Sequence, residues 1–332
     1  MFSIAIKFNL ISDILVLMKA FLLLFIIQVI LIASMQSRTQ VAMGTFISVK
    51  LEEEHIKYSS RIFEIFKEIE DSISSYKKDS VIFMLNKNKS AKLDRFAFES
   101  LNISKELYED TDGYFDITVG SITKDLYHFG ESEFIPHVKV LKSAKVGFER
   151  LKFDENRATL DSHVKVDLGG MGKGYAVDKA IEYLKKEGIT KSVVAASGDI
   201  RCLKSCKIDI QNPQVNSSHV NSVLLSFETL GSEIGVSTSG NYNRYVKSSK
   251  NNHLINPKSK KSQEEFISIT LISDISSTKL DAYTTAVSVM PKNQAYKFLK
   301  NRDIAYVILQ ADKKLVVSDN ISKYVKKLLT DI

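Results

Sequence analysis

Residues 166–178 read Val166-Asp167-Leu168-Gly169-Gly170-Met171-Gly172-Lys173-Gly174-Tyr175-Ala176-Val177-Asp178 and hold four of the chain's 14 glycines. A segment this rich in glycine loses much backbone entropy on folding, so it is typical of places where main chain turns tightly or approaches another group closely. The apolar residues that follow recur with helical spacing, and Gly188 marks the end of that pattern. We therefore expect a glycine-rich turn that leads into a helix, whose free N–H groups and dipole suit a phosphate.

The two common phosphate-binding loops do not fit this segment. A Walker A loop needs a glycine five residues before its last glycine, but Asp167 stands there, and Gly174 rather than Ser or Thr follows Lys173. The dinucleotide fingerprint fails because no glycine occupies its last position. The segment could also be a tight strand-to-helix connection that binds no ligand. Residues elsewhere in the chain have to distinguish these two interpretations.

Composition describes an ordinary globular protein. The chain has 332 residues, of which 44% are hydrophobic and 26% charged, enough for one large domain or two small ones. The net charge of +7 comes with scattered lysines, without an arginine-rich block or a basic aromatic stripe. We therefore expect no nucleic-acid partner. The charge instead favours an anionic membrane surface or an anionic substrate.

The N-terminal segment carries a targeting signal. Lys19 precedes an almost purely apolar run from Ala20 to Ala33, which has the length of a signal-peptide core and is short for a membrane-spanning helix. If the residues before Met18 are genuine, residues 11–33 are long enough for an anchor. We predict a signal peptide or membrane anchor over residues 1–37, followed by one domain over residues 38–332. The protein is then exported and faces the periplasm at the inner membrane, with cleavage of the leader left open.

The only two cysteines are Cys202 and Cys206. Their spacing is not Cys-x-x-Cys, and no second pair is present for a zinc site. In an extended strand they lie too far apart to bridge. We therefore expect two free thiols.

Helical and strand patterns alternate without a regular βαβ rhythm, which favours the α+β class. Residues 41–51 read as one strand, and residues 148–160 as a hairpin. Further strands are expected over residues 192–196, 207–211, 223–227, 266–272, 305–309 and 314–317, and helices over residues 60–73, 94–108, 278–289 and 293–300.

Some polar residues have no part in forming these elements. Asp281 and Thr285 are four residues apart on an expected helix and so point the same way. Two oxygens on one helix face suit a hard cation such as Mg²⁺. His253 lies in a loop that ends at Pro257. Singly, an Asp at a helix start is often a cap, and a loop histidine is often a surface residue.

In order along the chain, the short motifs resemble those of the ApbE-type FAD:protein FMN transferase family. The resemblance covers nearly all of the chain after the leader. Its motifs are Met43-Gly44-Thr45, Ser75-Tyr76 with Asp79-Ser80 and Asn86, Gly113-x-Phe115-Asp116-x-Thr118-Val119-Gly120, the segment 166–178, Ser197-Gly198-Asp199, Thr238-Ser239-Gly240, His253-x-Ile255-Asn256-Pro257, and Asp281-x-x-x-Thr285.

The resemblance implies a single mixed α/β domain of the ApbE type, related to the T-fold. Members of the family use Mg²⁺ to cleave the pyrophosphate of FAD, and they attach FMN through a phosphoester to a threonine of an exported redox protein. The expected cofactor is therefore Mg²⁺, with FAD as substrate and an acceptor protein as partner. Membrane association is also expected.

The resemblance also implies roles for individual residues. Asp281, Thr285 and a backbone carbonyl near Gly172 would hold the metal, and His253 would be the base for the acceptor hydroxyl. The family usually has alanine where Gly172 stands, and the glycine that closes the turn after Pro257 is missing. The residues expected around the flavin nucleotide are Met43, Tyr76, Asp116, Thr118, Lys173, Asp178, Thr238, Ser239, Gly240 and His253.

Two other functions remain open at this point. The same site could use water in place of threonine and act as a Mg²⁺-dependent FAD pyrophosphatase. Alternatively, the protein could bind flavin after export without catalysis.

Overall fold

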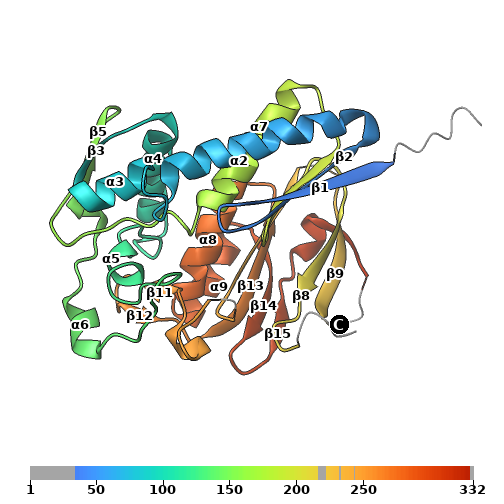
Figure 1. Cartoon of the computed structure of the whole chain (residues 1–332). Helices are drawn as coiled ribbons and strands as arrows, with labels where there is room; N and C mark the ends of the chain where they lie inside the picture. Colours follow the sequence, from blue (N-terminus) through green and yellow to red (C-terminus); the bar gives the residue numbers. More distant parts are fainter. Residues whose placement is uncertain (1–33, 216–221, 232, 243, 330–332) are drawn as a thin grey trace, which may run out of the picture.

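The computed structural model describes residues 34–215, 222–231, 233–242 and 244–329. Its centre is an eight-stranded antiparallel sheet with strand order β1-β2-β6-β7-β10-β13-β14-β15 (Figure 1). The predicted α+β class is confirmed. The strands of this sheet are β1 (Met35–Ala42), β2 (Thr45–Glu52), β6 (Ser192–Ala196), β7 (Asp199–Cys202), β10 (Ile234–Gly240), β13 (Phe266–Ser273), β14 (Ala305–Gln310) and β15 (Leu315–Val317).

Three long helices cover one face of the sheet: α2 (Ser59–Ile73), α7 (Gly172–Lys186) and α8 (Ser277–Val289) (Figure 1). α2 shows why the sequence folds this way, since its buried residues Ile62, Phe66 and Ile69 recur with helical spacing. α8 is buried on nearly all sides, so its sequence shows little amphipathic contrast. The helices expected over residues 60–73 and 278–289 are confirmed.

The other face of the sheet is covered by a smaller sheet with strand order β16-β9-β8, formed by β16 (Val325–Leu328), β9 (Val223–Thr229) and β8 (Lys207–Gln211). Phe227 and Ile210 of the small sheet lie in one buried cluster with Ile272 and Val307 of the large sheet. β13 is therefore covered on both faces. This explains why seven of its eight residues are buried, including the hydroxyl residues Ser268, Thr270 and Ser273.

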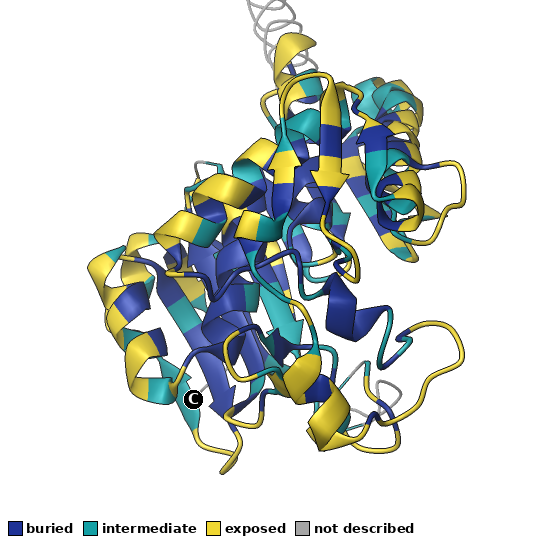
Figure 2. Cartoon of the chain, turned by 90° about the vertical axis from the view of Figure 1, so that its left-hand side faces the viewer, coloured by how far each residue is buried: buried dark blue, intermediate teal, exposed yellow. Residues whose placement is uncertain are grey.

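The remaining elements surround this core. Figure 2 shows buried residues gathered in the middle of the molecule and exposed residues on loops and outer helix turns. The hairpin predicted over residues 148–160 is present as β4 and β5, which join β3 in a third sheet. These elements are α3 (Val81–Asn88), β3 (Ser90–Lys92), α4 (Arg95–Asp110), α5 (Gly120–Thr123), α6 (Val138–Ser143), β4 (Leu151–Phe153), β5 (Arg157–Leu160), β11 (Ile255–Asn256), β12 (Lys261–Ser262), α9 (Lys292–Asn301) and the 3₁₀ turns η1 (Glu53–Tyr58), η2 (Phe148–Arg150), η3 (Ser249–Asn251) and η4 (Ile321–Lys323).

The single strand predicted over residues 41–51 is wrong, because the chain reverses inside it. Met43 and Gly44 both adopt left-handed backbone, with φ of 52° and 69°. Two consecutive residues with positive φ make the tight turn that matches the twist of paired strands. β1 therefore pairs with β2 as a hairpin, with Ala42 opposite Thr45.

The prediction of free thiols is also wrong, because Cys202 and Cys206 form a disulfide. The prediction assumed that both cysteines lie in one extended strand. β7 instead ends at Cys202, and the chain turns before Cys206. The turn brings the two Cα atoms to 6.2 Å, a separation that a disulfide can span.

Residues 1–33, which include most of the predicted leader, lie outside the described residues. β1 begins at Met35, within the stretch assigned to the leader. In the part of the chain that the structure describes, no helix combines the length and apolar character needed to cross a membrane.

Candidate active site

The candidate site forms where the start of α7 crosses α8. Gly174, in the first turn of α7, has no room for a side chain, because a Cβ there would lie 2.3 Å from the backbone oxygen of Ser277. This close crossing lets the Gly174 N–H donate to Oδ2 of Asp281 at 3.1 Å. Gly174 thus fixes the distance between the two helices and holds the Asp281 carboxylate.

Thr285 lies one turn after Asp281, and its hydroxyl donates to the carbonyl oxygen of Gly170 at 3.2 Å. A Cβ on Gly170 would come within 3.1 Å of this hydroxyl, so the absence of a side chain permits the approach. The structure therefore brings together a buried carboxylate, a hydroxyl and a main-chain carbonyl. All three are hard oxygen donors of the kind that Mg²⁺ binds, and the donor set fits that ion.

Within the glycine segment, the carbonyl that accepts from Thr285 belongs to Gly170, and the metal-binding carbonyl expected near Gly172 stays a prediction. Gly172 is the first residue of α7, and its N–H donates to the Leu168 oxygen at 2.8 Å. Its nearest side-chain neighbours are Ile73 and Met43. Gly170 was not singled out from the sequence, because only the turn geometry decides which carbonyl faces α8.

Lys173 supplies the positive charge beside these acids. Its ammonium lies 3.1 Å from Asp199 and 3.6 Å from Asp281. Burial lowers the pKa of Lys173, but the two carboxylates more than offset this and raise it above its usual value. Burial and the neighbouring Asp199 charge raise the pKa of Asp281 to about 7, although Lys173 acts in the opposite direction. The structure therefore places Lys173 beside Asp281 and Asp199, and its contact with the nucleotide stays a prediction.

His253 stands in the loop that precedes β11, and Asn256 of β11 ties that strand to the end of α8 by a hydrogen bond of 2.6 Å to the Val289 oxygen. Nδ1 of His253 lies 3.1 Å from the carbonyl oxygen of Arg244. A carbonyl only accepts, so Nδ1 carries the proton and Nε2 keeps its lone pair. Burial and the Arg244 guanidinium lower the pKa of His253 to about 4, which keeps the ring neutral at pH 7.

Tyr76 contacts Phe129, Arg244 and Lys124, three residues that the sequence did not predict at the site. Its hydroxyl donates to the Phe129 oxygen at 2.9 Å, and Arg244 donates both to the same oxygen at 2.9 Å and to the Tyr76 hydroxyl. The Lys124 ammonium lies 3.4 Å from the centre of the Tyr76 ring and 3.4 Å from Asp167. Asp167 and Arg244 stand in or beside the quoted motifs, whereas nothing in the sequence pointed to Lys124.

Asp116 and Thr118 hydrogen-bond to each other within their own loop. The Thr118 hydroxyl and N–H both donate to Oδ1 of Asp116, at 2.7 and 2.8 Å. Burial raises the pKa of Asp116 to about 6. The Ile117 oxygen of the same loop accepts a hydrogen bond of 2.7 Å from the Asp167 N–H. The loop therefore supports the start of the glycine segment.

The carboxylate of Asp178 also accepts its hydrogen bonds from groups of the protein. Its carboxylate accepts from the N–H groups of Ser277 and Thr278, both at 2.8 Å, and from the Thr278 hydroxyl at 2.6 Å. It therefore caps the start of α8. This is the cap function considered above for acidic residues, but it acts between two helices rather than within one.

Thr238, Ser239 and Gly240 end β10 next to the β6–β7 turn. The Thr238 N–H donates to the Gly198 oxygen at 3.1 Å, and its hydroxyl lies 2.9 Å from that of Thr270. Gly198 adjoins Asp199, so the end of β10 is close to the Lys173 ion pairs. Met43 reaches the other side of the site, since a Cβ on Gly172 would lie 3.6 Å from its methyl group.

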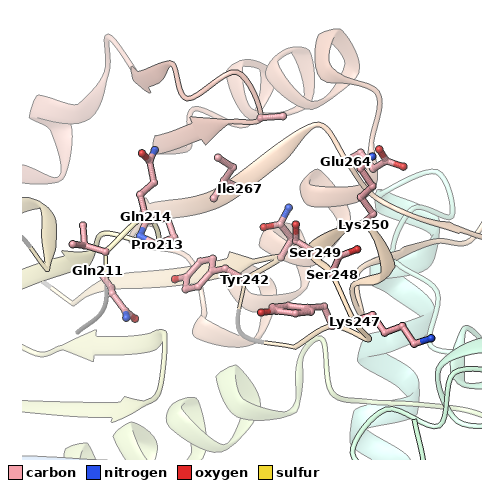
Figure 3. A pocket seen from close by; sticks show the side chains of 14 residues that line it. Gln211, Pro213, Gln214, Tyr242, Lys247, Ser248, Ser249, Lys250, Glu264 and Ile267 are labelled. Carbon is pink, nitrogen blue, oxygen red and sulfur yellow. The ribbon is translucent and has the colours of Figure 1, made fainter. Parts of the chain in front are cut away.

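Two further features lie apart from these residues. An open cleft of about 820 Å³ is bordered by Gln211 and Gln214 on one side and by Lys250 and Glu264 on the other (Figure 3). None of the predicted site residues lines it. Glu52, Glu54 and His55 also form an acidic group near the surface, remote in sequence from Asp281 and Thr285.

Comparison with known proteins gives a consistent result. A family model described as the ApbE family matches residues 43–308. An FAD:protein FMN transferase of Haemophilus influenzae is 27% identical over 292 residues, which are 80% of this chain and 82% of that protein. One from Buchnera aphidicola subsp. Schizaphis graminum is 29% identical over 313 residues, which are 86% of this chain and 89% of that protein.

Solved structures agree on the fold. The ApbE protein of Thermotoga maritima has a TM-score of 0.79 at 22% identity and covers 89% of this chain and 100% of that chain. The flavin transferase ApbE of Vibrio cholerae has a TM-score of 0.74 at 21% identity, and the match covers 88% of this chain and 100% of that chain.

Proposed function

The chain belongs to the ApbE family, and on this premise we propose that it is an FAD:protein FMN transferase that uses Mg²⁺ and modifies a threonine. The observation that carries the proposal is the oxygen cluster of Gly170, Asp281 and Thr285 beside Lys173. A cluster of this kind suits a reaction in which a charged phosphate must leave.

Gly170, Asp281 and Thr285 are the residues that would hold Mg²⁺. The ion would supply positive charge that stabilises the leaving phosphate. Lys173 is paired with Asp281 at 3.6 Å, and with a cation at Asp281 it would be needed less to neutralise that carboxylate. Its ammonium could then donate to an anionic oxygen of the pyrophosphate.

His253 is the proposed base. The threonine oxygen attacks the phosphorus on the flavin side of FAD, a new P–O bond forms, and the bond to the bridging oxygen breaks to release AMP. The threonine proton moves to Nε2 of His253, the nitrogen that the Arg244 carbonyl leaves unprotonated. A bound pyrophosphate offsets the positive charges of Arg244 and Lys173, and this raises the pKa of His253 from about 4 toward a value useful for catalysis.

Export to the periplasmic face of the membrane is part of the proposal. The apolar run from Ala20 to Ala33 supports a signal peptide or anchor. The Cys202–Cys206 disulfide supports an oxidising compartment, where such bonds persist. The acceptor is then an exported redox protein at the same membrane face.

The test is to incubate the protein with FAD, Mg²⁺ and a candidate acceptor, and to measure flavin fluorescence on the acceptor after denaturing electrophoresis. Transfer predicts fluorescence on the acceptor. This fluorescence should be lost when the threonine of the acceptor is replaced by alanine. Free FMN with AMP and an unlabelled acceptor would favour the pyrophosphatase. FAD left intact would favour a binding protein.

A further inference from the structure

The start of α8 is held by two charged residues, one on α7 and one on β7. Asp178 of α7 accepts three hydrogen bonds from Ser277 and Thr278, the first two residues of the helix. The buried guanidinium of Arg201 on β7 donates to the Asp274 oxygen at 3.1 Å and to the Ile275 oxygen. Asp178 therefore binds the N–H groups of the first turn, and Arg201 binds carbonyls just before it.

Both residues are linked to the acidic site through their own elements. Arg201 and Asp199 are two residues apart on β7 and thus lie on one face of the strand. Asp178 and Gly174 are four residues apart on α7, and Gly174 holds Asp281. The same strand and helix that bind Asp281 and Lys173 therefore also bind the start of α8.

Asp281 follows Ser277 and Thr278 by one helical turn, and Thr285 follows them by two. A shift or fraying of the first turn would move the Asp281 carboxylate relative to Gly170 and Lys173. Helix starts fray readily, because their N–H groups lack partners within the helix. At this helix start, Asp178 supplies those partners for Ser277 and Thr278.

We propose that Asp178 and Arg201 are positioning residues that fix α8 so that Asp281 and Thr285 meet the Gly170 carbonyl in one cation site. Asp178 is then not a nucleotide ligand but acts through the helix that it caps. The part of this inference that concerns the cation rests on the proposed function.

The central experiment compares Asp178→Ala with Asp94→Ala. Asp94 is a matched control, because its carboxylate caps α4 by accepting from the Ala97 N–H at 2.8 Å and from Ser72 at 2.6 Å, and α4 carries none of the predicted site residues. Mg²⁺ affinity of the full chain is measured by calorimetry without FAD, and amide hydrogen exchange is measured without metal.

Asp178→Ala is expected to weaken Mg²⁺ binding at least tenfold and to speed exchange in the first two turns of α8. Asp94→Ala is expected to speed exchange in α4 and to leave Mg²⁺ affinity within twofold of the wild type. A general loss of stability cannot imitate this result, since the affinity of a protein that stays folded does not depend on its margin of stability.

Unchanged Mg²⁺ affinity in Asp178→Ala would overturn the inference, as would an equal loss in Asp94→Ala. If the wild type binds no Mg²⁺, the metal assignment under the proposed function fails, and the exchange data alone decide whether Asp178 holds α8. If Asp178→Ala does not fold, Asp178→Asn replaces it. The amide keeps one accepting oxygen, so an intermediate loss is expected, and wild-type behaviour would contradict the proposal.

Arg201 provides an independent arm of the same test. Arg201→Met removes both hydrogen bonds to the segment before α8, whereas Arg201→Lys can restore only one. Mg²⁺ affinity is expected to fall in the methionine variant and to recover in part with lysine. Equal Mg²⁺ affinity in both variants and the wild type would exclude Arg201 as a positioning residue.

Discussion

Gly174→Ala is the substitution whose effect follows most directly from the geometry. The new Cβ would lie 2.3 Å from the Ser277 oxygen and 2.8 Å from Cβ of Asp281, so α7 and α8 must separate by about 1 Å to restore ordinary contact. Such overpacking costs about 1–3 kcal/mol. Above pH 7, where the Asp281 carboxylate is charged, weakening its hydrogen bond from Gly174 costs a further ~1.5–3 kcal/mol. The better helix propensity of alanine returns about 1 kcal/mol.

The expected net loss is roughly 3 kcal/mol of unfolding free energy, with a larger relative loss of FAD cleavage because Asp281 is displaced. The assay is urea denaturation followed by circular dichroism, with AMP release from FAD measured at a temperature where the variant stays folded. Gly231→Ala is the control, since nothing lies within 4 Å of a Cβ at that position, and it should change stability by less than about 0.5 kcal/mol. Wild-type stability and activity in Gly174→Ala would refute the close crossing of the two helices.

Four other predictions concern the site and the disulfide. Asp281→Asn should lower Mg²⁺-dependent FAD cleavage by at least about 100-fold, measured as AMP release, and an unchanged rate would remove this carboxylate from the metal site. Thr285→Val should weaken Mg²⁺ binding while Thr285→Ser keeps it, and calorimetry showing equal loss in both would exclude the hydroxyl as the ligand. Folding lowers the pKa of His253 from 6.5 to about 4, so the unfolded chain takes up a proton first as the pH falls. The stability that the neutral ring provides is therefore present above pH 6.5 and is lost between pH 6.5 and 4. The wild type should therefore lose more unfolding free energy than His253→Gln over that interval, and parallel pH profiles would contradict the lowered pKa. Reduction of the Cys202–Cys206 bond should cost about 2 kcal/mol, as expected for a loop this short, and thiol labelling without reductant should find neither cysteine.

The sequence predicted what depends on local pattern. The helices that carry Asp281, Thr285 and Lys173 are present, as are the buried strands around them. The antiparallel hairpin near Asp154 is also present, because turn residues and alternation are encoded within a few positions. Local periodicity decides such elements, whatever lies elsewhere in the chain.

The sequence failed where distant residues decide the outcome. Asp178 stands in a glycine-rich motif, and its carboxylate accepts three hydrogen bonds from residues about a hundred positions later, which no local pattern signals. Which glycine carbonyl meets Thr285 depends on the path of the turn, and the structure places Gly170 there. The metal-binding carbonyl expected near Gly172 stays a prediction. The Cys202–Cys206 bridge was missed because it needs a chain reversal that two cysteines alone do not signal.

The central claim is that Gly170, Asp281 and Thr285 form the cation site at which FAD is cleaved. The most direct measurement is a crystal structure of the protein with FAD and Mn²⁺, in which anomalous scattering locates the ion without reference to its ligands. We expect an ion about 2.0–2.2 Å from the Asp281 carboxylate, the Thr285 hydroxyl and the Gly170 carbonyl, beside the pyrophosphate. An ion bound instead at Glu52, Glu54 and His55, with none at Asp281, would contradict it.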